Sequence, residues 1–310
     1  MLIIINPKAG GGKALQKWQK IESEVRTRLG SFNIYQLDKL SDLSAVILQW
    51  IAGGERDFVA AGGDGTVNLL VNALMEAPED VAKKTRLGAI GLGSSNDFHK
   101  PFCNDSMIKN IPCRIDFGSV RPHDAGIIAY SMDNDIQSTK YWLINSSIGI
   151  TAEANRLFNT PGSILRFLKK HAPSCAIVYA ALKILVSFRA REVQISIDDD
   201  NIGNVYVDNL AVVKNPHFSG NFRYDSPHEI DSGYFNVHLV ENKSLSGKIL
   251  TLWKLSRPPS KNNHLTQCRH SSKLTIASTK PMALEFDGEV VTANAATFTL
   301  KHMAIQVCTN

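Results

Sequence analysis

Apolar positions in the first third of the chain follow two alternating patterns. Short, nearly continuous apolar runs are typical of buried parallel strands. Such a run lies at residues 2–5, and further strands are expected at 32–37, 58–61 and 86–92. Between them, apolar residues recur at helical spacing, which predicts helices ending near Leu29, at 43–52 and ending near Glu76. This order predicts a parallel sheet flanked by helices, with ligands bound at the carboxyl ends of its strands.

Past Arg121 the apolar period changes to two, which is typical of strands with one buried face. We expect strands at residues 142–144, 193–197, 205–213, 234–240, 273–276, 283–286 and 297–307. One helical stretch at 164–188 interrupts them, and the polar, proline-containing segment 256–272 is expected to be a loop. The sequence therefore predicts an α/β N-terminal domain followed by a mostly antiparallel β-sandwich.

The composition is that of a globular protein, and the length favours two domains. The chain has 310 residues, of which 44% are hydrophobic and 20% charged, and this exceeds what one core usually serves. The net charge of +5 favours an anionic partner. Two basic runs without any acid lie at 154–191 and 242–284. Each alone is typical of a solvated face, but two in one half indicate an anionic lipid surface rather than nucleic acid.

The cysteines and the apolar stretches bear on location. Five widely spaced cysteines form no CxxC pair, so we expect reduced thiols in a cytoplasmic protein. They are Cys103, Cys113, Cys175, Cys268 and Cys308. The N-terminus is expected to be a strand, not a signal peptide. The longest apolar stretch, 176–188, is too short to span a bilayer and contains Lys183, so any membrane contact is expected to be peripheral.

The most specific motif is Gly62-Gly63-Asp64-Gly65-Thr66, which joins a predicted strand to a predicted helix. Glycines permit a sharp turn, and the free N–H groups at a helix start favour an anion such as phosphate. An aspartate in this turn repels a bare phosphate but suits one that carries Mg²⁺. The alternative is a tight turn with Asp64 as a cap, which leaves Thr66 and Asn68 unexplained.

Two further loops follow neighbouring strands, so we expect all three to converge at one edge of the sheet. One loop is Asn6-Pro-Lys-Ala-Gly-Gly-Gly-Lys13, and the other is Gly93-Ser-Ser-Asn-Asp97. Neither has the spacing of a Walker A loop or of GxGxxG. Each alone is compatible with a helix cap or a surface turn. Together they predict a phosphate cradle, with Lys8 or Lys13 as point charges.

Asp287-Gly288 is a strong hairpin signal, and Asp287 is also a candidate general base. The residues alone leave these two interpretations open. The nine histidines show no paired-ligand spacing, so none is expected to bind a metal.

These residues resemble the diacylglycerol kinase catalytic family of lipid kinases, which includes sphingosine, ceramide and small bacterial lipid kinases. The matching motifs are Asn6-Pro7 with its glycine loop, 62–66 with Asn68, Gly93 with 96–98, 145–149, 220–233 and Asp287-Gly-Glu289. The resemblance covers nearly the whole chain in order. NAD kinases share the central turn, and phosphofructokinases come close, but neither matches the whole set.

The resemblance implies that residues 1–121 form the nucleotide-binding domain and that 122–295 receive the lipid. It also implies that 296–310 return to the first domain, and that ATP binds in a cleft between domains. The nucleotide site would comprise Asn6, Pro7, Lys8, Ala9, Gly10, Gly62, Gly63, Asp64, Gly65, Thr66, Val67, Asn68, Ser94, Asn96 and Asp97. Asp64 would organise Mg²⁺–ATP, and Asp287 would accept the proton of the lipid hydroxyl.

The chain departs from the family at several positions. Leu69 stands where a glutamate is usual, and Thr151 replaces an acid that binds the lipid head in sphingosine kinases. Bacterial members hold a structural Mg²⁺ near an Asp-Asp-Gly turn through an aspartate and main-chain carbonyls. The corresponding set here is Asp231, Ser232, Glu229 and Tyr234. Ser232 takes the place of the side-chain ligand, and this weakens the case for that second metal.

The leading hypothesis is an ATP- and Mg²⁺-dependent lipid kinase acting on a diacylglycerol-like lipid at an anionic membrane surface. A soluble-substrate kinase of the NAD kinase type is the second. A non-catalytic lipid- or nucleotide-binding member is the third, motivated by Leu69, Thr151 and Ser232. The sequence does not identify the lipid, and a homodimer is compatible with it.

Overall fold

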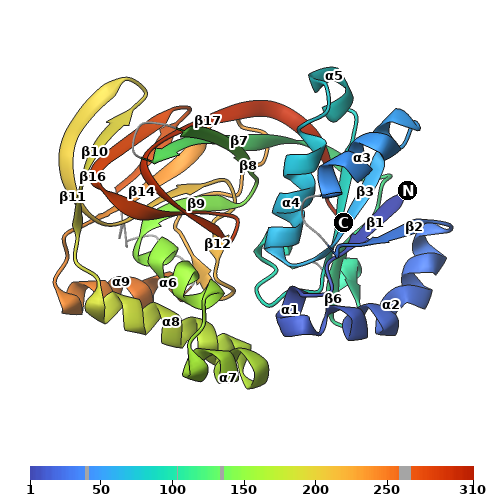
Figure 1. Cartoon of the computed structure of the whole chain (residues 1–310), viewed down its shortest axis with the longest axis horizontal. Coiled ribbons are helices and arrows are strands. Elements are labelled where there is room, and N and C mark those ends of the chain that lie inside the picture. Colours follow the sequence, from blue (N-terminus) through green and yellow to red (C-terminus); the bar gives the residue numbers. More distant parts are fainter. Residues whose placement is uncertain (39–41, 103, 133–135, 258–266) are drawn as a thin grey trace. The chain divides into compact units, whose positions relative to one another are not determined.

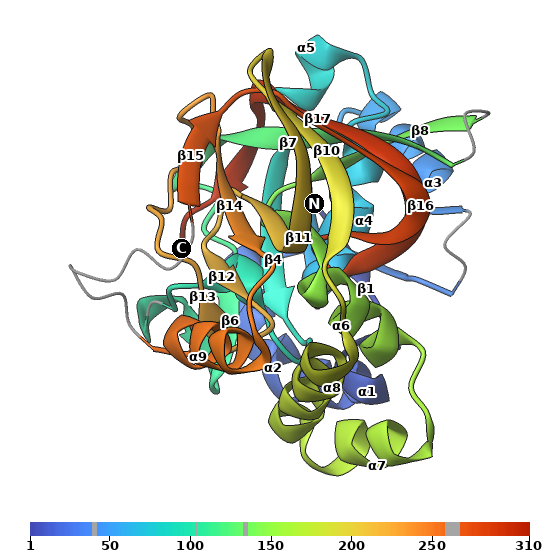
Figure 2. The ribbon, with the colours of Figure 1, turned by 90° about the vertical axis from the view of Figure 1, so that its left-hand side faces the viewer.

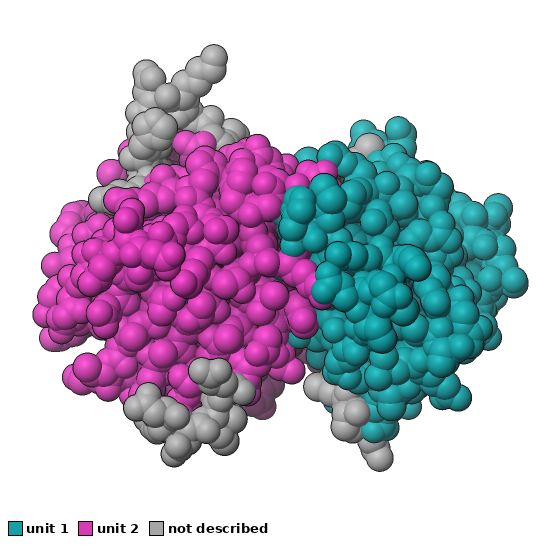
Figure 3. Space-filling model, turned by 90° about the horizontal axis from the view of Figure 1, so that it is seen from above, with its two compact units in different colours: residues 1–125, 302–310 teal, residues 126–301 magenta. Residues whose placement is uncertain are grey.

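The computed structural model describes residues 1–310 except 39–41, 103, 133–135 and 258–266. The chain divides into two compact units, which Figure 3 colours separately. Unit 1 comprises residues 1–125 and 302–310, and unit 2 comprises residues 126–301. Each unit has a large cluster of buried apolar side chains. The cluster of unit 1 draws on residues between Ile3 and Ile115, and that of unit 2 on residues between Ile128 and Phe298.

Unit 1 is built on a parallel sheet with the order β2-β1-β3-β4. Its strands are β1 (Leu2–Ile5), β2 (Asn33–Gln36), β3 (Asp57–Gly62) and β4 (Arg86–Gly91). β1 is buried throughout and pairs in parallel with β2 and β3, and β3 pairs in parallel with β4. This confirms the parallel sheet predicted from the sequence. The more polar β2 lies at the edge, where it has one neighbour.

Two later segments complete this sheet. The last part of β17 (Glu289–Cys308) runs parallel to β4, with Gln306 opposite Arg86. β6 (Ile111–Arg114) pairs antiparallel with β4 and with the short β5 (Met107–Ile108). Unit 1 therefore contains strand residues from both ends of the chain (Figure 1).

The helices described in unit 1 are α1 (Ala9–Gly12), α2 (Ala14–Leu29), α3 (Leu43–Ala52), α4 (Asp64–Leu74) and α5 (Glu79–Ala82). α2 packs Trp18, Ile21 and Val25 into a buried cluster with apolar residues of β1, β3 and β4. These three side chains recur at helical spacing, which is why the sequence pattern identified the helix.

Unit 2 is mostly antiparallel. Its strands are β7 (Val120–Met132, which begins in unit 1), β8 (Ile136–Trp142), β9 (Asn145–Gly149), β10 (Arg191–Ile197), β11 (Asp200–Val213), β12 (His217–Phe218), β13 (Phe222–Arg223), β14 (Phe235–Glu241), β15 (Gln267–Ser271), β16 (Leu274–Phe286) and most of β17. β9 and β10 both pair with β11 and β16, so they occupy successive halves of one position between those long strands. Apolar side chains of these strands form one buried cluster around Trp142, Phe235 and Phe298.

The helices described in unit 2 are α6 (Ile150–Asn159), α7 (Ser163–His171), α8 (Pro173–Ser187) and α9 (Leu245–Leu255). α8 packs against α6, α7 and α9. Figures 1 and 2 show α7, α8 and α9 gathered at one side of the unit 2 strands. In the ranges that the structure describes, no helix is both long and apolar enough to cross a membrane.

Several sequence-based boundaries were wrong for identifiable reasons. The predicted strand 142–144 is the end of β8 followed by a bend at Leu143 and Ile144. The predicted strands 273–276 and 283–286 are one strand, β16, whose register shifts between Ala277 and Met282.

The predicted loop 256–272 is also partly wrong. Residues 267–271 form β15, which pairs with β14, while residues 258–266 lie outside the described part. Among the strands that the structure describes, β15 stands last in the order and pairs with β14 alone, so it needs no apolar alternation.

The four described cysteines are free, as expected. Cys113 and Cys308 are buried, which raises the pKa of each thiol to about 12, and Cys175 and Cys268 are exposed. Cys103 lies outside the described residues. None of the four is in a disulfide.

Candidate functional site

The three predicted loops of unit 1 meet at the carboxyl edge of its parallel sheet. Asn6 Nδ2 donates to Thr66 Oγ1 at 3.0 Å, which joins the first loop to the central turn. A Cβ on Gly10, where φ is 58°, would lie 2.5 Å from the carbonyl oxygen of Leu92. A Cβ on Gly93 would lie 2.5 Å from Cα of Gly63. Only glycine permits these close approaches, and they bring the three loops together as the strand order predicted.

The central turn is fixed mainly by its own main chain. Thr66 and Val67 donate their N–H groups to the carbonyl oxygen of Gly63 at 2.8 and 3.2 Å. Asp64 is the first residue of α4 and follows the N-cap position, which Gly63 occupies. Oδ1 of Asp64 accepts the N–H of Phe98 at 2.9 Å. Asp64, the residue predicted to organise Mg²⁺, therefore also links the central turn to the third loop through this hydrogen bond.

The third loop is closed by Asn96, whose backbone is left-handed with φ 51°. Its Oδ1 accepts the N–H of Gly93, and its Nδ2 donates to the carbonyl of Gly91, both at 3.0 Å. Asp97 is buried and pairs with the buried Lys100 ammonium at 2.8 Å. Ser94 is exposed, so of these residues its hydroxyl is the one open to a ligand.

The first loop, residues 6–13, has exposed lysine side chains and exposed main-chain groups. Asn6 Oδ1 accepts the N–H of Lys8 at 3.0 Å, a side-chain-to-backbone turn that starts the loop. Lys8 and Lys13 are exposed, as are the main-chain groups around Gly11. The donor set is thus cationic side chains and amides, which suits phosphate oxygens.

Sequence reasoning missed Lys17 on α2. Its ammonium donates to the carbonyl oxygens of Leu92 and Gly93, both at 3.1 Å, and so braces the end of β4 from the first loop's helix. Burial, and secondarily the charge of Lys13, lower the pKa of Lys17. No short motif marks a lysine at this spacing, because its role depends on a strand far along the chain.

Asp287 lies in unit 2, at the hairpin between β16 and β17. It is 3% exposed, and Asp287 and Gly288 both have left-handed φ, 46° and 90°. Two left-handed residues form the Asp-Gly hairpin turn that the sequence predicted. The carboxylate accepts three main-chain N–H groups, from Leu143 at 2.8 Å, Ile144 at 2.9 Å and Asn145 at 3.1 Å. Asp287 is therefore the turn residue that the sequence predicted, and its buried carboxylate is still a candidate for the general base.

The carboxylate of Glu285 supports this hairpin. It is 2% exposed; its Oε1 accepts the N–H of Gly288 at 2.7 Å, and its Oε2 accepts the hydroxyl of Ser147 at 2.8 Å. It is a second functional candidate that sequence reasoning missed, because a lone acid on a strand gives no signal.

The expected metal ligands at 229–234 are arranged around a lysine. Lys214 Nζ donates to Ser232 Oγ at 3.1 Å and to the carbonyl oxygen of Tyr234 at 2.8 Å. The hydroxyl of Tyr234 donates to the carboxylate of Glu229. Two of the expected ligand oxygens thus face an ammonium group. Within the described ranges, no group of three or more His, Cys, Asp or Glu side chains is arranged to hold a metal ion.

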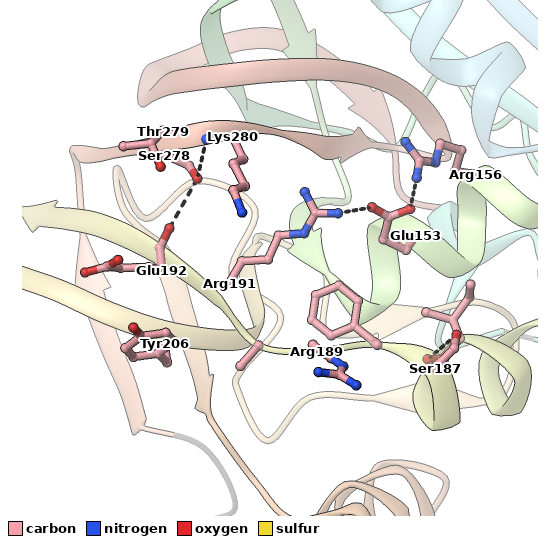
Figure 4. A pocket seen from close by; sticks show the side chains of 13 residues that line it. Glu153, Arg156, Ser187, Arg189, Arg191, Glu192, Tyr206, Ser278, Thr279 and Lys280 are labelled. Atoms are coloured by element: carbon pink, nitrogen blue, oxygen red, sulfur yellow. Dashed lines mark hydrogen bonds and ion pairs between the residues drawn. The ribbon is translucent and has the colours of Figure 1, made fainter.

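The basic run 154–191 contributes to a pocket of about 610 Å³ in unit 2 (Figure 4). Arg156 and Arg191 both pair with the buried Glu153, so one carboxylate serves two guanidinium groups. Figure 4 shows Lys280 reaching into the pocket beside Arg191. Four basic and two acidic side chains line it, so its charge suits an anion.

Comparisons with known proteins identify relatives of this chain. Residues 1–126 match the family described as Diacylglycerol kinase catalytic domain. A diacylglycerol kinase of Staphylococcus saprophyticus is 24% identical over 299 residues, covering 93% of this chain and 88% of that protein. One from Staphylococcus aureus (strain Newman) is 25% identical over 296 residues, covering 93% and 85%.

Solved structures share the fold. A crystal structure of a diacylglycerol kinase from Bacillus anthracis str. Sterne is 16% identical, with a TM-score of 0.65, and covers 100% of this chain and 96% of its own. Another structure from that organism is 18% identical with a TM-score of 0.70 and the same coverage. At these identities the likeness concerns the fold alone.

The family model and the matched relatives together indicate that this protein is a kinase. Residues 1–126 match the diacylglycerol kinase catalytic-domain family, and diacylglycerol kinases that are 24–25% identical align with 93% of the chain. The resemblance drawn from the motifs is thereby confirmed.

Proposed function

We propose that this protein is an ATP-dependent kinase that transfers the γ-phosphate to a hydroxyl of a diacylglycerol-like lipid. The kinase class comes from the family. The single observation that carries the lipid assignment is a set of exposed apolar and basic side chains on the neighbouring helices α7, α8 and α9. Exposed apolar side chains gathered in this way mark interaction sites, and a membrane is the one that a lipid kinase needs.

These helices expose both apolar and positively charged side chains. On α7, Ile164 and Phe167 are 64% and 63% exposed, and Lys169, Lys170 and His171 form its last turn. The apolar residues of α8 and α9 that are also exposed are Val178, Leu182, Val186, Leu245, Ile249, Leu250 and Trp253. A peripheral, anionic membrane surface matches both properties.

The converging loops of unit 1 are suited to hold Mg²⁺–ATP. Main-chain amides of the first loop, Lys8 and Ser94 would bind phosphate oxygens, and Asp64 would organise the metal. When bound, Mg²⁺–ATP supplies the phosphoryl group and neutralises its developing charge. Lys17 keeps the end of β4 in place beneath these loops.

Asp287 is proposed to accept the proton of the lipid hydroxyl. Three main-chain donors hold its carboxylate in one orientation. A general base held in this way needs no reorganisation when the hydroxyl arrives.

The test is transfer of labelled γ-phosphate from ATP to diacylglycerol or phosphatidylglycerol in mixed micelles, with NAD as a detergent-free soluble acceptor. We expect lipid phosphorylation that falls about 10²–10⁴-fold in Asp287→Asn and in Asp64→Asn. Asp200→Asn and Asp80→Asn, which change exposed aspartates in unit 2 and unit 1, are the matched controls.

Other outcomes point elsewhere. Phosphorylation of NAD but no lipid would replace the proposal by a soluble-substrate kinase. Binding of vesicles without turnover on any lipid would favour a non-catalytic member, an alternative that gains support from the structural engagement of Asp287.

A further inference from the structure

We propose that the ammonium of Lys214 takes the place of a structural magnesium ion in this chain. Lys214 directly follows β11 and is 1% exposed. A buried lysine is costly unless oxygen atoms replace its hydration shell. Here Ser232 Oγ and the carbonyl of Tyr234 do so at 3.1 and 2.8 Å. The ring of Tyr234 adds a cation–π contact at 5.9 Å.

These oxygens are the ones that the family resemblance assigns to a metal, and they do not fit one here. Oxygen ligands lie about 2.0–2.6 Å from Mg²⁺ or Ca²⁺, so a bound ion would sit within a few ångströms of the ammonium. Two cations that close repel each other strongly in a buried site. Ser232 also offers a neutral hydroxyl where a metal site would offer a carboxylate.

The exchange preserves the local charge. A divalent ion with one aspartate carries one net positive charge, and a lysine with one serine carries the same. A lysine and a serine are therefore an electrostatically matched replacement for a metal and an aspartate. This explains why the aspartate is dispensable at Ser232, which the sequence alone left unexplained.

Two hydrogen bonds, which share Ile144, connect the main chain of Lys214 to the candidate base. The N–H groups of Lys214 and Asn215 donate to the carbonyl of Ile144 at 3.0 and 2.8 Å, and the N–H of Ile144 donates to Asp287. The main chain at Lys214 thus supports the bend that holds Asp287, while its ammonium holds the turn at 232–234. The inference does not depend on phosphoryl transfer, because its readouts are metal content and stability.

The experiment uses the full chain without nucleotide. Elemental analysis of the wild-type protein should find no stoichiometric Mg²⁺ or Ca²⁺, and its melting temperature should be unchanged by EDTA or by added Mg²⁺. Lys214→Met should melt several degrees lower, because the ammonium and its two hydrogen bonds are lost. Lys140→Gln, which changes an exposed lysine on β8, should melt as the wild type does.

The decisive variant restores the metal. Lys214→Met combined with Ser232→Asp should melt several degrees higher with millimolar Mg²⁺ than with EDTA, whereas Lys214→Met alone should not respond. Stoichiometric metal in the wild-type protein, or a fall in its melting temperature with EDTA, would overturn the proposal. So would an unchanged melting temperature in Lys214→Met. If Lys214→Met does not fold, the wild-type metal analysis still decides.

Discussion

The main-chain N–H of Ile144 donates to Oδ1 of Asp287 at 2.9 Å, although the two residues are 143 positions apart. The same carboxylate accepts the N–H groups on either side of Ile144. Asp287 therefore holds the bend between β8 and β9, in addition to any role as a base. A substitution here acts on folding and on chemistry together, and the two effects must be measured separately.

Asp287→Asn is expected to destabilise the protein. The amide keeps one acceptor oxygen, but its NH₂ group faces a main-chain N–H, which costs about 1–3 kcal/mol. Urea unfolding measures this loss, and the exposed control Asp200→Asn should stay within about 0.5 kcal/mol of the wild type. If Asp287→Asn unfolds like the wild type, the carboxylate is not the clamp that its contacts indicate.

Gly93→Ala is expected to separate two of the three loops at the sheet edge, which are proposed to bind ATP. Its Cβ would lie 2.5 Å from Cα of Gly63 and 2.8 Å from Oδ1 of Asn96, so backbone must move. We expect the melting temperature to fall by roughly 2–8 °C and the KM for ATP to rise, because loop positions change. Gly162→Ala is the control, since its Cβ meets nothing within 4 Å. Normal ATP binding by Gly93→Ala would show that the contact does not order the site.

Secondary structure elements that depend on residues close together in the chain were predictable from the sequence. The parallel strands of unit 1, α2 and α3 follow apolar periods, and the Asp287-Gly288 hairpin follows turn chemistry. The convergence of the three loops followed because each loop ends a strand of the same parallel sheet.

Features that depend on distant partners were not predictable. Leu143 and Ile144 are apolar, and this pattern predicts a strand. The chain bends there instead, and their N–H groups donate to the carboxylate of Asp287. Lys17 and Lys214 bond carbonyl oxygens 75 and 20 positions away, and no spacing rule encodes that. α6 was missed because its helix begins directly at the end of β9 without a side-chain cap.

Stability is expected to fall in mild acid because of His99. This histidine is 4% exposed, and burial, with the charge of Arg114 second, lowers its pKa to about 3. The unfolded chain has a histidine pKa near 6.5, so between about pH 6.5 and 3 the unfolded state binds the extra proton. Stability is therefore complete above about pH 6.5 and is lost as the pH falls below it.

For His99 this loss is about 2 kcal/mol between pH 7.5 and 5. Urea unfolding at the two pH values should show a smaller difference in His99→Phe, which keeps a ring but does not titrate. His238, whose pKa burial lowers to about 4, adds a similar dependence that remains in the variant. The exposed His171→Phe should leave the difference unchanged. A His99→Phe protein with the full wild-type pH dependence would contradict the assignment.

Glu285 is expected to tolerate glutamine but not alanine. In Glu285→Gln the amide oxygen can still accept the N–H of Gly288, and the NH₂ group can face Ser147, because a hydroxyl rotates from donor to acceptor. In Glu285→Ala the buried hydroxyl of Ser147 and the half-buried N–H of Gly288 lose this acceptor, and the loss is about 1–3 kcal/mol for the buried group. Urea unfolding should therefore rank wild type close to Glu285→Gln and well above Glu285→Ala.

The same pair separates charge from shape in catalysis: a changed pH–rate profile in Glu285→Gln at wild-type stability would mean that the carboxylate charge tunes Asp287. Equal destabilisation by both substitutions would instead show that the negative charge, and not the hydrogen bonds to the hairpin, stabilises this part of unit 2.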